Sequence, residues 1–310
     1  MIHFSRSSFF IALGCFFITL MTVLGISYYT VYRFVSAGDR IIYGTKLSTL
    51  TIDIRNELLK RNDVKHVMFE TSDGFELQGL LFARPHAQAN LVLCHGYQGC
   101  KEFMYGLIDM FPTYNILIFD FRAHGQSPGS TTSIGCHEYK DVIAAADFMK
   151  HYDNKLRLVV LGISMGGASA LKAAEVKQDL CDALIIDSTF SELKTMFLRG
   201  FNLKVGLPYY PFFPIARAMF HYVNNCDIHN MSPVESVKKI KLPILFIHSC
   251  NDKFINPENS LQLYAVAQNK DTRLWIGPRC RHGWLHTYHA PMYQKKVLRF
   301  LDQTIFSQKD

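Results

Sequence analysis

The sequence predicts an α/β fold in which a mostly parallel central sheet is covered by helices on both faces. Three observations support this prediction: short continuous apolar runs, helical patterns between them, and a hairpin pattern before the first run. Runs of about four to eight apolar residues are typical of strands buried on both faces. We expect such strands at residues 90–94, 115–119, 158–161, 183–186, 243–247 and 272–276.

The first element along the chain is an apolar segment. No charged residue occurs from Ser7 to Tyr32, and this run is long enough to cross a hydrocarbon core of about 30 Å as a helix. We favour an uncleaved membrane anchor over residues 1–37, since signal-peptide cores span only about 7 to 15 residues. A cleaved signal peptide, suggested by the small residues behind the run, and a buried helix are the alternatives.

Residues 38–62 are predicted to form a polar, partly helical linker. We expect this linker to hold the following domain away from the bilayer. The basic residues after the apolar run outnumber those before it, which favours a cytoplasmic C-terminal domain. A short tail before a long apolar run is also usual for an anchor whose C-terminal domain is exported, so the side of the membrane stays open.

Residues 63–310 are predicted to form the main domain. It opens with an antiparallel hairpin, because two alternating segments, 66–71 and 75–82, flank an Asp-Gly turn. Helical spacing with alanine-rich faces occurs at residues 138–152 and 166–176. Repeated alternation of strands and helices predicts right-handed crossovers and a parallel sheet.

Residues 190–235 interrupt this alternation and are rich in aromatic residues and proline. We interpret the segment as a small helical cap above the strand ends. Such a cap could form an apolar roof for an acyl substrate, pack its aromatic residues against the main domain only, or contact a membrane. The sequence leaves these three roles open.

Charge and cysteine content exclude several classes of function. The formal net charge is +7, but Lys and Arg are scattered, so we expect no nucleic-acid partner. A basic surface instead favours anionic lipid headgroups. The eight cysteines form no C-x-x-C pair, so we expect neither a metal site nor thioredoxin-like chemistry. One disulfide is considered, between Cys250 and Cys280, which follow the last two predicted strands.

The strongest functional signal is Gly162-Ile163-Ser164-Met165-Gly166, which follows a predicted strand and begins a predicted helix. In this context the G-x-S-x-G pattern is typical of a nucleophile elbow, because small flanking residues let the backbone turn sharply and expose the hydroxyl. The helix N-terminus also places positive dipole near developing negative charge. We predict that Ser164 is a nucleophile; an ordinary strand-to-helix turn is the alternative.

A serine hydroxyl is a poor nucleophile at neutral pH, so it needs a base and a group that orients that base. In the chain order Ser, Asp, His, the candidates are Asp252 and His282, which lie on the loops after the last two predicted strands. The loops at the carboxyl ends of parallel strands face one crevice. Asp187 is the alternative acid and His286 the alternative base.

An oxyanion hole needs two backbone donors near the nucleophile. Met165, directly after Ser164, is one candidate, and Tyr97, in the turn after an earlier predicted strand, is the other. The alternative for this turn is a purely structural role in which His95 bonds the backbone.

Several motifs together resemble the α/β-hydrolase superfamily over about residues 65–305. They are Leu93 to Gly96, Asp120 to Ser127, the Ser164 elbow, Asp252 and His282. Within this superfamily, the segment from Ser232 to Pro243 is similar to the bud-emergence-protein-like serine hydrolases.

Two positions depart from the superfamily pattern: Ala123 and Cys250 stand where glycine is common. Neither removes a reactive group, so they bear on local turn geometry and not on the class of reaction. Haloalkane dehalogenases and epoxide hydrolases share the fold but carry aspartate at the elbow, so Ser164 argues against both.

The resemblance implies acyl transfer to water through an acyl-serine intermediate, with no metal or organic cofactor. We therefore expect a carboxylic-ester hydrolase that acts on a small-molecule or lipid-like acyl substrate near a membrane. A thioesterase or a serine peptidase of the same fold would use the same residues, because fold does not choose among them. A catalytically silent, membrane-anchored binding module is the alternative from another class.

Overall fold

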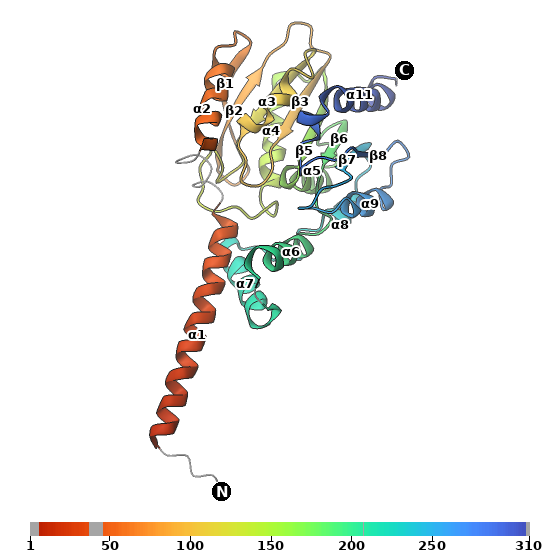
Figure 1. The fold of residues 1–310 in the computed structure, drawn as a ribbon. Helices are drawn as coiled ribbons and strands as arrows, with labels where there is room; N and C mark the ends of the chain where they lie inside the picture. Colours follow the sequence, from red (N-terminus) through yellow and green to blue (C-terminus); the bar gives the residue numbers. More distant parts are fainter. Residues whose placement is uncertain (1–5, 37–45, 207, 308–310) are drawn as a thin grey trace.

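The computed structural model describes residues 6–36, 46–206 and 208–307. One eight-stranded sheet forms the centre of the main domain, in the order β1-β2-β4-β3-β5-β6-β7-β8 (Figure 1). β2 runs antiparallel to both of its neighbours, and all other neighbouring pairs are parallel. The strands are β1 (Val64–Glu70), β2 (Glu76–Phe82), β3 (Ala89–Cys94), β4 (Tyr114–Phe119), β5 (Arg157–Ile163), β6 (Ala183–Asp187), β7 (Ile244–Ser249) and β8 (Arg273–Gly277).

The central strands are buried on both faces, as their continuous apolar runs predict. In β5, Leu158 and Val160 join the hydrophobic cluster on one face of the sheet. Val159, Leu161 and Ile163 join the cluster on the other face, because successive side chains of a strand point in opposite directions. The mostly parallel sheet and the opening hairpin are therefore confirmed.

Helices cover both faces of the sheet. The first cluster includes side chains from α4, α5, α8 and α9, and the second includes side chains from α2, α3, α10 and α11. The helix bounds are α2 (Lys46–Leu59), η1 (Lys101–Met104), α3 (Tyr105–Ile108), α4 (Tyr139–Tyr152), α5 (Met165–Val176), α8 (Pro233–Val237), α9 (Glu258–Ala265), α10 (Leu285–Tyr288), α11 (Ala290–Leu301) and the terminal π-helix η2 (Asp302–Phe306).

Two further helices, α6 (Leu193–Val205) and α7 (Tyr209–Asn224), occupy the segment expected to form the cap. Both lie below the sheet in Figure 1, beside one end of α1 (Arg6–Val35). The two cap helices are joined by edge-to-face contacts of Phe197 with Phe213 and Phe220, at ring-centroid distances of 6.0 and 5.4 Å. The aromatic residues of this segment therefore build the inside of the cap.

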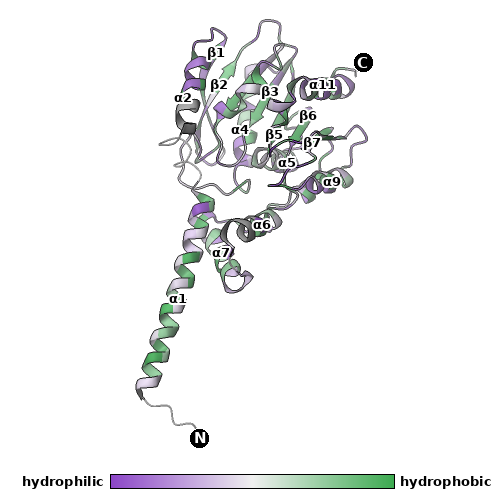
Figure 2. Ribbon diagram, viewed as in Figure 1, coloured by the Kyte–Doolittle hydropathy of each residue, from purple (hydrophilic) through white to green (hydrophobic). Residues whose placement is uncertain are grey.

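The N-terminal helix α1 has two parts. The residues from Ser7 to Thr22 are exposed and almost wholly apolar, and α1 is long and apolar enough to cross a membrane (Figure 2). The last turns pack against α7, where Val31, Phe34 and Val35 are buried in the same cluster as the cap aromatics.

That the linker holds the domain away from the bilayer stays a prediction. α1 itself touches the domain, because its last turns bury apolar side chains against the cap. Residues 37–45 of the predicted linker lie outside the described residues. The rest of it forms α2 and the start of the hairpin, and Leu58 of α2 is buried in the main core.

A disulfide joins Cys136, in the loop before α4, to Cys226, directly after α7. The considered bridge between Cys250 and Cys280 does not form, because both thiols are free. The residues of the bridge are 90 positions apart in the sequence, so spacing gave no indication of the pair. The bridge fastens one end of the cap to the main domain.

We predict that Cys226→Ser lowers the free energy of unfolding by about 4 to 5 kcal/mol, because a cross-link closing a loop of this size constrains the unfolded chain. Urea unfolding of the full chain in detergent measures the loss. The matched control is Cys250→Ser, an exposed free thiol, which should change stability by less than about 0.5 kcal/mol. Equal stability of the two variants would contradict the bridge, as would eight thiols titrated in the unfolded protein without reductant.

Candidate active site

The turn between β5 and α5 holds Ser164 in a strained conformation. Its φ is +55° and its ψ is −116°, values that a residue with a side chain rarely adopts. Three glycines make the turn sterically feasible. A Cβ on Gly162 would lie 2.5 Å from Gly166, one on Gly166 would overlap the carbonyl oxygen of Cys94, and one on Gly167 would overlap the hydroxyl of Thr189.

The loop after β6 stabilises this turn from the side. The Ser164 N–H donates to the backbone oxygen of Asp187 at 2.8 Å. The Thr189 hydroxyl donates to the Ser164 backbone oxygen at 3.1 Å. Both backbone polar groups of the strained residue are therefore satisfied within the protein.

The three predicted side chains lie within hydrogen-bond distance of one another. The Ser164 hydroxyl lies 2.9 Å from Nε2 of His282, and Nδ1 of His282 lies 2.6 Å from Oδ2 of Asp252. With Nδ1–H donating to the carboxylate, Nε2 is left as an acceptor for the serine proton. Ser164 and Asp252 are buried, whereas the His282 side chain is 22% exposed.

Asp252 is held as a carboxylate by donors on all sides. Burial alone would raise its pKa, but hydrogen bonds from His248 and His282 lower the pKa below its ordinary value. The other oxygen, Oδ1, accepts the N–H groups of Phe254 and Ile255 at 2.9 and 3.0 Å. The negative charge that orients His282 is therefore maintained at neutral pH.

The hydroxyl of Ser249 joins the loops that carry the acid and the histidine. It accepts the N–H of Cys280 at 2.8 Å and lies 3.0 Å from the carbonyl oxygens of Pro278 and Cys280. Ser249 ends β7, and Cys280 follows β8, so this one side chain fixes the relative position of the two loops.

The alternative acid and base lie elsewhere. Asp187 is fully buried, accepts a hydrogen bond from the Ser188 hydroxyl, and has its pKa raised to about 6 by burial. His286 is buried on α10, where burial lowers its pKa to about 4. The hydrogen bonds of His282 go to Ser164 and Asp252 and not to these residues.

The loop after β3 passes directly against the nucleophile turn. A Cβ added to Gly96 would lie 3.4 Å from the Cβ of Ser164, and Tyr97 lines the same cavity as Ser164 and Met165. This is the side on which the sequence predicts the two oxyanion donors, Tyr97 and Met165. Their role as donors remains a prediction.

Two buried histidines shape that loop. His95 lies 2.8 Å through Nδ1 from the Gly96 oxygen and accepts the Phe121 N–H at Nε2. His124 accepts the Gln98 N–H at Nε2 and lies 2.8 Å through Nδ1 from the Arg122 oxygen. Burial, followed by the proximity of His124, lowers the pKa of His95 to about 3, so the ring is neutral. The structural role considered for His95 is thus present beside the predicted donors.

Two cavities adjoin the site. The first lies beneath the cap beside Ser164 and has a free volume of about 20 Å³. Its other lining residues are almost all apolar, and they include Phe34 from α1, Ile134, Phe190, Met196, Phe254 and Ile255.

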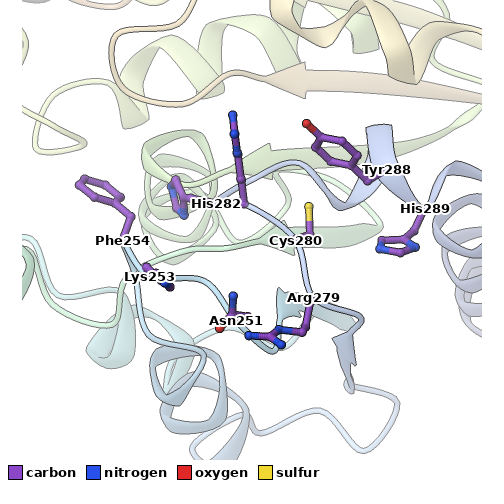
Figure 3. A pocket seen from close by; sticks show the side chains of 9 residues that line it. Asn251, Lys253, Phe254, Arg279, Cys280, His282, Tyr288 and His289 are labelled. Carbon is purple, nitrogen blue, oxygen red and sulfur yellow. The ribbon is translucent and has the colours of Figure 1, made fainter.

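The second cavity is an open groove outside His282, with a free volume of about 740 Å³ (Figure 3). It lies beside His282 without including Ser164, so the small cavity, which Ser164 lines, is the one closer to the Ser164 hydroxyl. The part of the chain that the structure describes holds no group of three His, Cys, Asp or Glu side chains placed to bind a metal ion.

The fold, the strained serine and its histidine define an α/β hydrolase. Residues 130–308, more than half of the chain, match the prolyl oligopeptidase family. The chain belongs to this family. Its relatives include the uncharacterized protein YqkD of Bacillus subtilis, which is 30% identical over 236 residues covering 74% of this chain and 76% of YqkD. Protein bem46 of Schizosaccharomyces pombe is 24% identical over 71% of each chain.

Similar solved structures include an esterase of Pyrococcus furiosus, with a TM-score of 0.65 and 24% identity, covering 78% of this chain and 91% of the esterase. An acylaminoacyl peptidase of Pyrococcus horikoshii has a TM-score of 0.58 and 18% identity, with 83% of this chain and 44% of the peptidase covered. These likenesses establish the fold. The resemblance to the α/β-hydrolase superfamily is confirmed, and so is that to the bud-emergence-protein relatives.

Sequence reasoning missed three contributors to the site. His248 follows the apolar residues of β7, so its sequence position indicates only a strand residue. In the structure its Nε2 lies 3.3 Å from Oδ2 of Asp252. Ser249 gave no signal beyond its place at a strand end. Phe34 belongs to the predicted anchor, a segment whose apolar pattern does not reveal which of its turns contact protein.

Proposed function

We propose that this protein is a membrane-anchored serine hydrolase that cleaves a carboxylic ester through an acyl-serine intermediate. The observation that supports it is the hydrogen-bonded line from the strained Ser164 through His282 to the ionised Asp252. A serine held this way has a base for its proton, and the base has a partner for the charge it acquires.

In the first step, Nε2 of His282 takes the hydroxyl proton while Oγ of Ser164 attacks the carbonyl carbon of the ester. The carbonyl electrons move to oxygen, and the N–H groups of Met165 and Tyr97 stabilise that oxyanion. Collapse of the tetrahedral intermediate breaks the bond to the alcohol, which leaves with the proton from His282.

Water then repeats the sequence on the acyl-enzyme. His282 takes a proton from water, the hydroxide oxygen attacks the acyl carbon, and the acid departs as Ser164 regains its proton. Asp252 stays ionised throughout and stabilises the imidazolium in both steps. The net change is one ester bond and one water converted into one acid and one alcohol.

The lining of the small cavity supports an ester with an apolar acyl part. Apart from Ser164 and the Tyr97 hydroxyl, its residues are apolar or aromatic, so it offers no charged partner for a peptide terminus or an acidic side chain. A thioesterase would use the same chemistry and remains the nearest alternative. A peptidase is the third candidate.

We infer that α1 anchors the protein in a membrane, because its exposed apolar length matches a hydrocarbon core. One relative, of Saccharomyces cerevisiae, is named an uncharacterized membrane protein, and it is 25% identical over 196 residues.

We place the hydrolase domain on the oxidising side of that membrane, because the disulfide between Cys136 and Cys226 persists only where thiols are not kept reduced. Alkylation of free thiols during membrane isolation tests this: six labelled cysteines would support the proposal, and eight would place the domain on the reducing side.

We predict that a fluorophosphonate probe labels the full chain once, at Ser164, and that Ser164→Ala abolishes both labelling and the turnover of p-nitrophenyl esters. The reason is that the probe needs an activated serine, and a binding module without catalysis would not react. Mass spectrometry of the labelled peptide locates the adduct. Intact ester turnover by Ser164→Ala would disprove the proposed function.

We predict that Asp252→Asn lowers kcat about 10³-fold to 10⁴-fold, since the amide no longer fixes the productive tautomer of His282. The matched control is Asp187→Asn. Asp187 is also a buried carboxylate, at the end of β6, and its substitution should change kcat by no more than a few fold. Steady-state kinetics on one soluble ester compares the two variants. If instead Asp187→Asn were the inactive one, the role of the acid would pass to Asp187.

A further inference from the structure

We propose that the last turns of α1 form the acyl-chain end of the substrate site, so that the protein hydrolyses esters of lipids resident in its own membrane. This inference rests on the proposed function and names its substrate class. Phe34 belongs to the anchoring helix α1, and yet it lines the cavity beside Ser164.

The end of α1 is fixed to the site by specific contacts. The Tyr97 hydroxyl donates to the Phe34 backbone oxygen at 2.7 Å, and the Thr132 N–H donates to the Val35 backbone oxygen at 2.9 Å. The ring of Phe34 lies 4.8 Å from that of Phe197 in the cap. The wall of the cavity is therefore continuous with the helix that enters the bilayer.

The length of α1 places this wall close to the hydrocarbon. A span that begins at Ser7 and crosses about 30 Å at 1.5 Å per residue ends about 20 residues later, near Ile26. Phe34 then lies about 12 Å beyond the hydrocarbon boundary, or less if the helix tilts. The proposal therefore requires a lipid acyl chain to extend about 12 Å beyond the hydrocarbon boundary, or less with tilt, to reach this position.

The surface of the cap around α1 suits a membrane interface. Tyr209, Tyr210 and Tyr222 of α7 are exposed, as are Tyr28 and Tyr29 of α1. Aromatic side chains with a polar end, such as tyrosine, are enriched at membrane–water interfaces. Since α7 packs on α1, these tyrosines lie on the two elements that border the end of the anchor (Figure 1).

The cavity must widen to accept a chain, because its free volume of about 20 Å³ is close to that of a single water molecule. Phe34, Phe190 and Met196 close it from three different elements, α1, the loop after β6 and the cap helix α6. Truncating Phe34 removes the wall on the anchor side. The residue therefore determines which chain lengths fit.

The test compares Phe34→Ala and Phe34→Trp in the full chain, with p-nitrophenyl esters of increasing chain length in detergent. Phe34→Ala should shift the ratio of long-chain to short-chain kcat/KM upward by about tenfold or more, and Phe34→Trp should shift it downward. Tyr29→Ala, an exposed aromatic on the same helix, is the matched control and should leave the ratio unchanged. Unchanged ratios in both Phe34 variants would overturn the inference.

A second measurement tests the route from the membrane. The full chain is reconstituted into phosphatidylcholine vesicles that carry a long-chain ester, or is mixed with separate vesicles that carry it. Hydrolysis should be at least tenfold faster when enzyme and ester share a vesicle. Equal rates would overturn membrane delivery while leaving the proposed function intact. Loss of short-ester turnover and of Ser164 labelling in the native chain would instead mean that the proposed function has failed.

The groove outside His282 has a cationic lining. Of the described residues that line it, Lys253, Arg279 and Arg281 are cationic and none is acidic. Figure 3 shows Lys253 and Arg279 among the lining side chains. No described carboxylate forms an ion pair with any of the three cationic residues. We infer that the groove binds an anionic group, a phosphate or a carboxylate, on the alcohol part of the ester. The alcohol leaves on the side of His282, which gives it the proton.

This second inference predicts a preference among leaving groups. Two esters of the same acid are compared, one of a neutral phenol and one of a phenol that carries a phosphate. The anionic ester should have the lower KM, and the double variant Arg279→Gln and Arg281→Gln should raise that KM about tenfold or more while changing the KM of the neutral ester little. Arg273→Gln, on β8 outside the groove, is the control.

Increasing salt should reduce the advantage of the anionic ester, because screening weakens interactions between exposed charges. Equal KM values for the two esters in the native chain would overturn the inference about the groove. Inorganic phosphate that competes as well as the anionic ester would show that the groove recognises a free anion and not a headgroup.

Discussion

The close contact between the loop after β3 and the turn at Ser164 is the constraint on which the site depends. A strand-to-helix turn with positive φ at a serine is unfavourable, and it persists only where the surroundings fix it. Here glycines at positions 162, 166 and 167 allow close contacts that a Cβ at any of them would prevent. The strain is thus balanced by packing, and the hydroxyl is fixed toward the histidine.

The other predicted site residues are positioned by the topology of the sheet. Parallel strands end at one edge, so the loops after β5, β7 and β8 meet there whatever their distance in the chain. This is why the sequence predicts that Ser164, Asp252 and His282 lie close together, and the structure places their side chains within hydrogen-bond distance of one another. Six of the strands were predictable from continuous apolar runs, and the first two from the alternating pattern on either side of an Asp-Gly turn.

Some contacts were not predictable from the sequence, because the composition around each residue does not distinguish the alternatives. His248 sits in an apolar strand, where nothing distinguishes a side chain that contacts a carboxylate from one that fills the core. The pairing of Cys136 with Cys226 depends on how the cap folds back over the domain. The contact of Phe34 with the cavity was not predictable either, because a helix that spans a membrane and a helix that packs on protein can have the same hydropathy pattern.

The helix α7 is attached both to the main domain and to α1, and this arrangement connects α1 to the candidate site. Near its last residue the disulfide holds it to the main domain, and along its length α1 packs against it. A movement of α7 must therefore displace it relative to α1 or bend the cap between these two attachments. If α1 spans a membrane, as proposed above, the membrane restricts that movement as well. Under that proposal, the movement of the cap depends on how α1 is held in the membrane.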